Sequence, residues 1–136
     1  MSGAGEQPGT GIVTKLSSRP VAATVERFTD LLASKGVKVF AVIDQAAEAR
    51  QTGLDLRETV LVIFGNPAAG TPVMAAAPLA ALDLPLKILV WDDSGQTKVS
   101  YYAPASIIAR HGLPADLTRN LAAIDPLTDA LIAPLG

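Results

Sequence analysis

The sequence predicts an α+β domain, a two-layer sandwich in which a five-stranded, largely antiparallel sheet carries helices on one face. Three observations support this class. Five short segments are apolar or alternate between apolar and polar residues, an amphipathic segment separates the first two, and the turn DDSG at 92–95 joins the last two. Because a tight hairpin turn joins antiparallel strands, we expect the late strands to pair in that sense.

The predicted strands occupy residues 11–17, 37–44, 59–64, 84–92 and 97–102. The second segment is β-branched and alternating, and the third is a continuous apolar run, both of which are typical of strands. Pro85 fits the start of its strand or an edge position, where no ladder donor is lost.

The main predicted helix lies between the first two strands. Four apolar residues share one face of it: Val21, Val25, Phe28 and Leu32. Gly36 then ends the helix, as a glycine just past a C-terminus does. Shorter helices are expected after Asp44, from the Thr71-Pro72 pair, from Pro104 to His111, around 115–124 and from Pro126.

The uncovered face of the sheet decides whether the domain stands alone. If solvent covers that face, we expect polar side chains on it, such as Lys15, Lys38 and Lys98. If Phe40, Val42, Trp91 and Tyr102 lie there instead, the face is partly apolar and a second subunit would cover it.

Composition limits the classes of function. The 136 residues suit one domain, with residues 1–10 as a flexible leader and 11–136 as the folded unit. The net charge is -2 and no basic cluster is visible, which disfavours nucleic-acid binding. There is no cysteine, and no apolar stretch of ~18 residues that would cross a membrane. We therefore expect a cytoplasmic domain without a cofactor or a metal.

The stretch FGNPAAGTPVM, residues 64–74, is the most informative segment. Thr71-Pro72 is typical of a helix start, so free N–H groups near Gly70 and Thr71 would hold a small anion. Asn66 and Met74 flank this cradle. The plainer alternative is that the glycines and prolines only turn the chain after a buried strand. Neither a Walker loop nor a dinucleotide fingerprint is present.

This stretch also carries a resemblance. FGNPAAGTPVM and LDLPLK, with AVIDQAAEARQ before them and VSYYAPASIIARHGL after them, resemble domain-of-unknown-function family 302 across residues 14 to about 125. The resemblance implies a β-α-β-β-β-β-α core related to the half-repeat of the TATA-binding protein, a homodimer, and a bacterial domain with no established activity. The family often has Asp-His where this chain has Asp44-Gln45, and a proline where it has Glu58.

Two carboxylates are candidates for acid–base chemistry. Asp83, between two leucines in LDLPLK, would have a raised pKa if it were buried alone, and Lys87, Arg50 or Arg57 could pair with it. Asp83 or Asp44 could equally cap backbone amides. His111, the single histidine, fits the C-terminus of a helix.

Three hypotheses follow. In the first, which the sparse polar inventory favours, the protein is a homodimeric, non-catalytic module that binds a small molecule, an anion among the candidates, near Asn66, Gly70, Thr71, Met74 and Asp83. In the second, Asp83 or Asp44 is a general acid or base and the 65–72 loop is an anion cradle. In the third, the domain only dimerises, and the loop amides bond internally.

Overall fold

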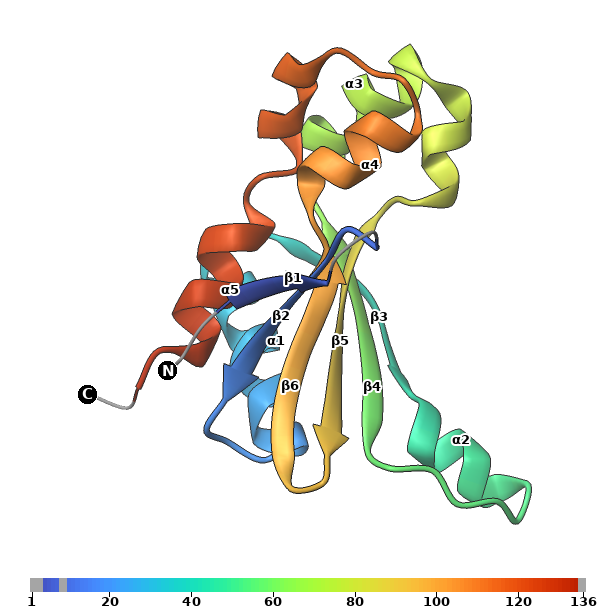
Figure 1. Cartoon of the computed structure of the whole chain (residues 1–136), viewed down its shortest axis with the longest axis vertical. Coiled ribbons are helices and arrows are strands. Elements are labelled where there is room, and N and C mark those ends of the chain that lie inside the picture. The colour runs from blue at the N-terminus through green and yellow to red at the C-terminus, as the bar shows by residue number, and fades with distance from the viewer. Residues whose placement is uncertain (1–3, 8–9, 135–136) are drawn as a thin grey trace.

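The computed structural model of the protein describes residues 4–7 and 10–134 (Figure 1). The strands are β1 (Ala4–Gln7), β2 (Ile12–Ser17), β3 (Lys38–Asp44), β4 (Thr59–Gly65), β5 (Leu86–Asp93) and β6 (Gln96–Tyr102). The α-helices are α1 (Val21–Ser34), α2 (Gln45–Gln51), α3 (Pro67–Ala76), α4 (Pro104–Arg110) and α5 (Ile124–Ile132). Two short 3-10 helices are η1 (Pro78–Leu82) and η2 (Ala115–Asn120).

The strands form one antiparallel sheet in the order β1-β2-β6-β5-β4-β3. All five predicted strands are present, and the α+β class is confirmed. The sheet has one strand more than predicted, because residues 4–7 of the predicted leader pair with β2. The sequence AGEQ carries neither strand propensity nor alternation, so no local signal marks it as a strand.

Helices α1 and α5 cover one face of the sheet (Figure 1). The predicted apolar face of α1 is confirmed, since Val21, Phe28 and Leu32 are buried in the main core. Phe28 meets Phe64 of β4 edge to face, with the ring centroids 5.0 Å apart.

A helical lobe beyond one end of the sheet was not predicted. We use "lobe" for α3, η1, α4 and η2, which gather above the strands (Figure 1). They enclose a second, smaller core made of Val73, Ala80, Leu84, Ile107, Ile108 and Leu121. The prediction that the helices lie on one face therefore holds for α1 and α5 only. The lobe makes a junction with the end of the sheet, and that junction holds the candidate site.

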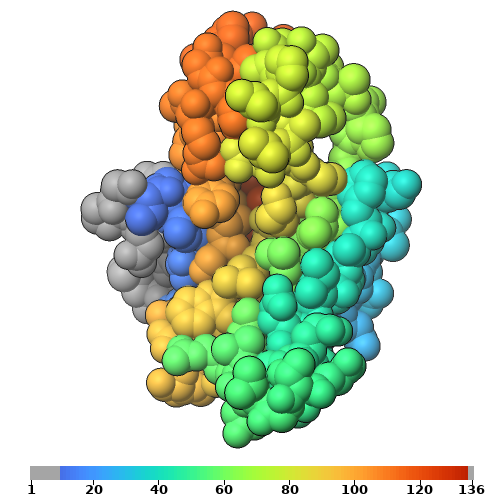
Figure 2. Space-filling model, turned by 90° about the vertical axis from the view of Figure 1, so that its right-hand side faces the viewer, coloured from blue at the N-terminus to red at the C-terminus, as the bar shows by residue number. Residues whose placement is uncertain are grey.

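The other face of the sheet is open, with apolar side chains at its centre and polar ones such as Lys87 and Ser100 beside them. Figure 2 looks onto its strands between the lobe and α2. Residues directly opposite in the register share a face, so Leu61, Ile63, Leu89 and Trp91 lie together there. Tyr102 and Lys98 of β6 are on the same face, as expected.

Two residues expected on the open face lie on the other one. Lys15 lies opposite Val99 of the core, so its side chain points under α5 and is only 3% exposed. Val42 lies opposite Val62 of the core, and an irregularity between Val39 and Ala41 in β3 sets that register. No helix in the described part of the chain is long and apolar enough to cross a membrane.

Candidate functional site

The FGNPAAGTPVM stretch forms the start of α3, earlier than predicted. Asn66, not Thr71, is the N-cap, and its side-chain Oδ1 accepts from the Ala68 amide at 3.0 Å. The Asn66 carbonyl accepts from the amides of Ala69 and Gly70 at 2.9 and 3.0 Å. Gly70 and Thr71 are therefore inside the helix, and the expected cradle of free amides at these residues is wrong. Pro67 takes the first helical position, where its missing N–H costs nothing.

The same stretch instead forms one wall of a cavity with a volume of about 360 Å³. The cavity lies where the lobe meets the ends of β3, β4 and β5. Three fully or largely buried side chains belong to its lining: Phe64, Leu121 and Leu127. Four residues predicted to bind a ligand line it as well: Asn66, Gly70, Thr71 and Met74.

Phe40 and Asn120 line the cavity but were not predicted. Phe40 sits at the irregularity in β3 and is 43% exposed. Asn120, at the end of η2, donates from Nδ2 to the Ala69 carbonyl at 3.0 Å and so ties η2 to α3. Both come from segments far from residues 64–74, so only tertiary structure brings them there.

Asp83 lies outside the cavity lining and belongs to an ion cluster. Its carboxylate contacts Nε2 of His111 at 2.6 Å and accepts from Nη1 of Arg110 at 3.0 Å. Burial acts to raise the pKa of Asp83, but these two hydrogen bonds outweigh it and hold that pKa below its ordinary value. The cluster fastens the connection after η1 to the end of α4.

Of the partners foreseen for Asp83, Lys87 does lie beside it. Lys87 Nζ donates to the backbone carbonyls of Asp83 and Pro85, at 3.3 and 3.0 Å, and burial lowers the pKa of Lys87 although the charge of Asp83 acts to raise it. Arg57 pairs with Asp93, at 3.7 Å. His111 is the residue after α4, as the sequence predicted, but its Asp83 contact needed the tertiary structure.

Asp44 is remote from the cavity. It caps α2, where its Oδ1 accepts from the Ala47 amide at 2.9 Å. In the β3–β4 pair, Lys38 lies opposite Gly65 and Asp44 lies opposite Val60, so Asp44 and the loop are at opposite ends of β3. Gln45, which follows Asp44, is equally distant. The fold does not bring Asp44 to the 65–72 loop as the enzyme hypothesis requires.

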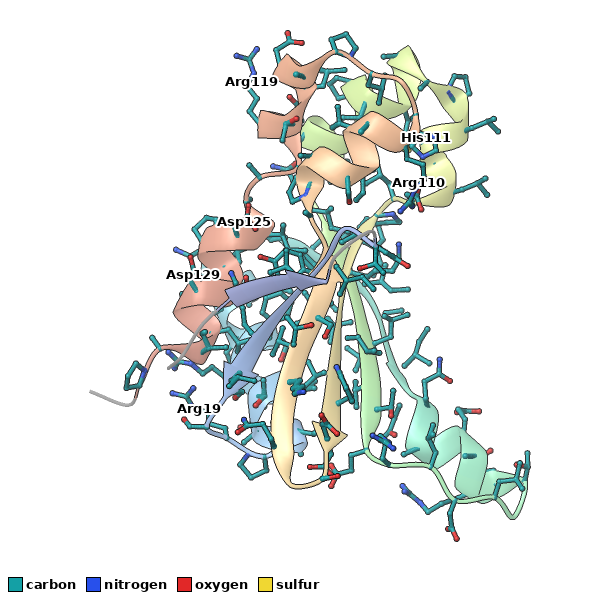
Figure 3. The ribbon with its side chains drawn as sticks, viewed as in Figure 1. Arg19, Arg110, His111, Arg119, Asp125 and Asp129 are labelled. Atoms are coloured by element: carbon teal, nitrogen blue, oxygen red, sulfur yellow. The ribbon has the colours of Figure 1, made fainter. Side chains whose placement is uncertain are left out.

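A buried polar cluster joins α5 to the sheet. Lys15 Nζ donates to Thr128 Oγ1 at 2.6 Å and to the Asp125 carbonyl at 3.1 Å, and lies 2.8 Å from the Asp129 carboxylate. Tyr101 donates to Asp125 Oδ1 at 2.6 Å. Burial acts to lower the pKa of Lys15, but Asp129 and Tyr101 outweigh it, so that pKa is raised. Figure 3 shows the two aspartates on α5.

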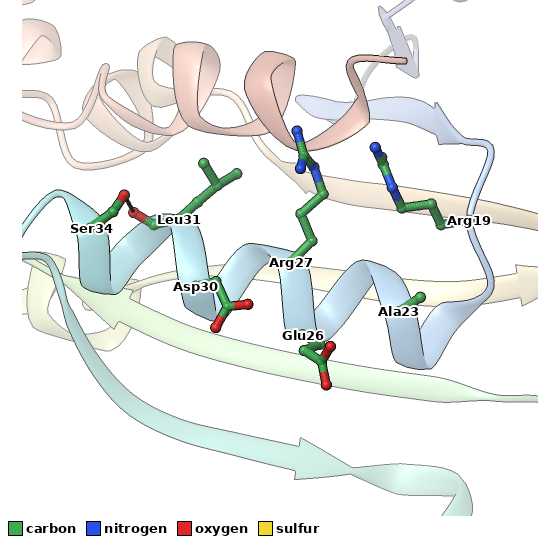
Figure 4. Close-up of a pocket in the computed structure, with 7 residues that line it drawn as sticks. All are labelled: Arg19, Ala23, Glu26, Arg27, Asp30, Leu31 and Ser34. Carbon is green, nitrogen blue, oxygen red and sulfur yellow. Dashed lines mark hydrogen bonds between the residues drawn. The ribbon is translucent and has the colours of Figure 1, made fainter. Parts of the chain in front are cut away.

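A charged groove of about 530 Å³ runs along α1. In Figure 4, Arg19 and Arg27 point toward α5, whereas Glu26 and Asp30 point away from it. The two guanidinium groups donate to carbonyls at the C-terminal end of α5, at 3.0–3.1 Å. They therefore stabilise the negative end of that helix, and each guanidinium group uses two of its donors for this contact within the fold.

Most of the chain matches a known protein family. The model of the domain of unknown function DUF302 matches residues 13–131, and the chain belongs to this family. A crystal structure of an uncharacterized DUF302 protein from Bacillus stearothermophilus matches 91% of this chain and 97% of its own, with a TM-score of 0.76 and 22% identity. That similarity shows the fold.

The curated relatives are longer proteins. Fluoride-specific ion channel FluC 1 of Brucella suis is 41% identical over 105 residues, which cover 76% of this chain and 41% of the relative. FluC 1 of Brucella abortus and FluC 2 of Brucella melitensis show the same identity, over 39% of their length. The chain thus spans about two fifths of the curated relatives it matches.

Proposed function

We propose that the chain is a non-catalytic, homodimeric module that binds a small molecule in the cavity between the lobe and the sheet. The observation that carries this proposal is the cavity itself, whose volume of about 360 Å³ falls within the usual range of ~300–1,000 Å³ for small-molecule sites. Its walls come from four separate parts of the chain, residues 37–40, 64–74, 84–86 and 120–127, so its shape depends on the whole fold.

The contents of the lining favour binding over catalysis. None of the residues that line the cavity within the described part of the chain is Asp, Glu, His, Lys or Arg. General acid–base catalysis needs a titratable group within hydrogen-bond reach of the reacting atoms. The backbone amides of Ala68, Ala69 and Gly70 donate to Asn66, within the loop itself. For these amides the structure agrees with the third hypothesis, in which the loop amides bond internally. The cavity is what favours a ligand.

The dimer part of the proposal rests on the open face. Its centre is apolar, with Leu61 and Leu89 directly opposite each other and Ile63 beside them. A flat apolar face of this kind on a small domain is typical of a protein–protein interface. Leu89→Lys should convert a dimer into a monomer in light scattering after gel filtration, whereas Gln51→Lys, on α2, should leave the dimer unchanged. A monomeric wild-type protein would contradict the dimer.

Thermal unfolding with a small-molecule library tests the binding role. A ligand at ~100 times its Kd adds roughly 2.7 kcal/mol of apparent stability, which shifts the Tm of a domain this size by several degrees. The control is Ala69→Leu, which places three extra carbon atoms in the lining of the cavity. Shifts that survive this substitution, or a library that shifts nothing, would contradict the cavity as the site.

A second candidate function comes from the names of the Brucella relatives. In those longer proteins a domain like this one would accompany a fluoride channel, and this chain would contribute to fluoride handling. Fluoride is a small, strongly hydrated anion that requires cations or several convergent donors. The apolar lining of the cavity does not suit it. Sodium fluoride against sodium chloride in the same thermal assay distinguishes this function, because a fluoride-specific shift would favour it.

A further inference from the structure

We infer that the cavity takes a neutral, amphipathic ligand of about a dozen non-hydrogen atoms. It has an apolar body and one uncharged end that both accepts and donates hydrogen bonds, as a primary amide does. This inference rests on the proposed binding function and specifies its ligand. The size of the ligand is inferred from the cavity volume of about 360 Å³. A water molecule occupies ~30 Å³ in the liquid, and a non-hydrogen atom of an organic ligand needs comparable space, so about a dozen such atoms fit.

The apolar body follows from the deep part of the cavity. Phe64, Leu121 and Leu127 are 1%, 1% and 4% exposed and present only carbon atoms. Pro85 and Met74 add further apolar surface. A charged group placed against these side chains would lose its hydration without gaining a partner, which costs far more than an apolar group would.

Three polar side chains in the same lining indicate that the polar end of the ligand is neutral and both donates and accepts hydrogen bonds: Asn66, Thr71 and Asn120. Asn66 Oδ1 accepts from an amide N–H, which fixes the orientation of its carboxamide and leaves Nδ2 as a donor. Asn120 Nδ2 donates to a carbonyl, which leaves Oδ1 as an acceptor. No described residue bonds to either remaining atom, nor to the Thr71 hydroxyl.

This combination of groups discriminates between ligand classes. A carboxylate or phosphate would meet the Asn66 donor but would face the Asn120 acceptor with no proton to offer. An ammonium group would meet the reverse problem. A primary amide or an alcohol offers both a donor and an acceptor, and no charged side chain of the lining is left to be neutralised.

Isothermal titration with matched probes tests the ligand class. Indole-3-acetamide and indole-3-acetate have the same shape and differ in charge, and benzyl alcohol, benzoate and benzylamine form a second set. We expect the neutral member of each set to bind at least about tenfold more tightly than its charged partners, a difference of about 1.4 kcal/mol. Ala69→Leu should weaken that binding at least about tenfold, whereas Ala68→Leu, exposed and outside the lining, should not.

A second variant guards against a folding defect. In Gly65→Ala the added Cβ would lie 3.6 Å from Pro85 Cβ and 3.8 Å from Phe40 Cε2. These are ordinary van der Waals distances, and both neighbours line the cavity. Its backbone needs no left-handed conformation, so the variant should fold and bind more weakly. Suppose that the charged probes bind as tightly as the neutral ones and that Ala69→Leu weakens the binding of both. The inference of a neutral ligand is then overturned, while the cavity remains the binding site. If no probe binds, or if neither variant changes the affinity, the inference and the site both fail.

Discussion

Lys15 offers the sharpest test of how the two layers are held together. Its stem crosses the core side of β2 and its ammonium group reaches α5, where it contacts Thr128, Asp129 and the Asp125 carbonyl. Lys15→Ala removes three methylene groups at about 0.8 kcal/mol each. It also removes charge-assisted hydrogen bonds worth about 1.5–3 kcal/mol. We expect a loss of about 3–5 kcal/mol in the free energy of unfolding, the range of a large-to-small core substitution.

Lys15→Met is the matched control, because it keeps the apolar stem and loses only the ammonium group. The groups left behind stay satisfied: Asp129 is 67% exposed and remains hydrated, and Thr128 still donates to the Ile124 carbonyl at 2.8 Å. We expect a loss of about 1 kcal/mol, because the cost of burying the ammonium group disappears together with its hydrogen bonds and offsets part of their loss. Urea unfolding at neutral pH measures the loss of free energy for both variants, from the shift of the urea midpoint at an unchanged m-value.

The pH dependence of this contribution has a definite sign. The pKa of Lys15 is raised in the folded protein, so its contribution is complete below the ordinary lysine pKa of 10.5. It is lost as the pH rises through the folded pKa. The difference between wild type and Lys15→Met should therefore be constant near neutral pH and shrink only above about pH 10.5. A Lys15→Ala loss below about 1 kcal/mol, or a Lys15→Met variant as stable as the wild type, would refute this role for the cluster.

Three further substitutions test the contacts of Arg27 with α5, of Tyr101 with Asp125 and of Asp83 with His111. Arg27→Ala removes two hydrogen bonds to the end of α5 and should cost about 1–2 kcal/mol in urea unfolding. Arg27→Lys should recover less than half of that loss, because an ammonium group lacks the planar two-donor geometry of the guanidinium; full recovery by lysine would argue against the capping geometry. Tyr101→Phe leaves the Asp125 carboxylate without its 2.6 Å donor and should lower the Tm by an amount equivalent to about 1–2 kcal/mol. Asp83→Asn should cost about 1 kcal/mol at pH 7. Because the folded pKa of Asp83 is depressed, that difference should vanish as the pH falls from about 4 through the folded pKa; a constant difference down to pH 2 would exclude the His111 contact as its source.

The strands and the main helix were predictable because their signals are local. Alternation, the DDSG turn and the spacing of Val21, Phe28 and Leu32 each act within a few residues. The lobe was not predictable in the same way. Each of its helices is short, and their shared core forms only after segments from 67–76 and 104–120 meet.

The site was predictable in position but not in chemistry. Asn66, Gly70, Thr71 and Met74 do line a cavity, because the turn residues of this stretch lie where strand and helix meet. Thr71-Pro72 is typical of a helix start, yet Asn66-Pro67 supplies the same cap and first-turn signal five residues earlier, and α3 begins there.

Lys15 could have been placed from the pattern of its own strand. The inward positions of β2 alternate, so a residue two places from Val13 shares its face. A solvated open face would be expected to carry Lys15, but the fold turns this lysine inward and supplies it with partners from α5. Asn120 has no comparable local signal, because its role depends on the Ala69 carbonyl.

The most direct test of the ligand cavity is a map of amide chemical shifts, recorded with ¹⁵N-labelled protein during a titration with indole-3-acetamide. A ligand in the cavity should produce its largest shifts at Gly65, Ala69, Gly70 and Asn120, which surround it from three elements. The Ala69→Leu variant should show none of them. Shifts that gather along α1 or on the open face of the sheet, with these four amides unmoved, would contradict the cavity as the site of binding.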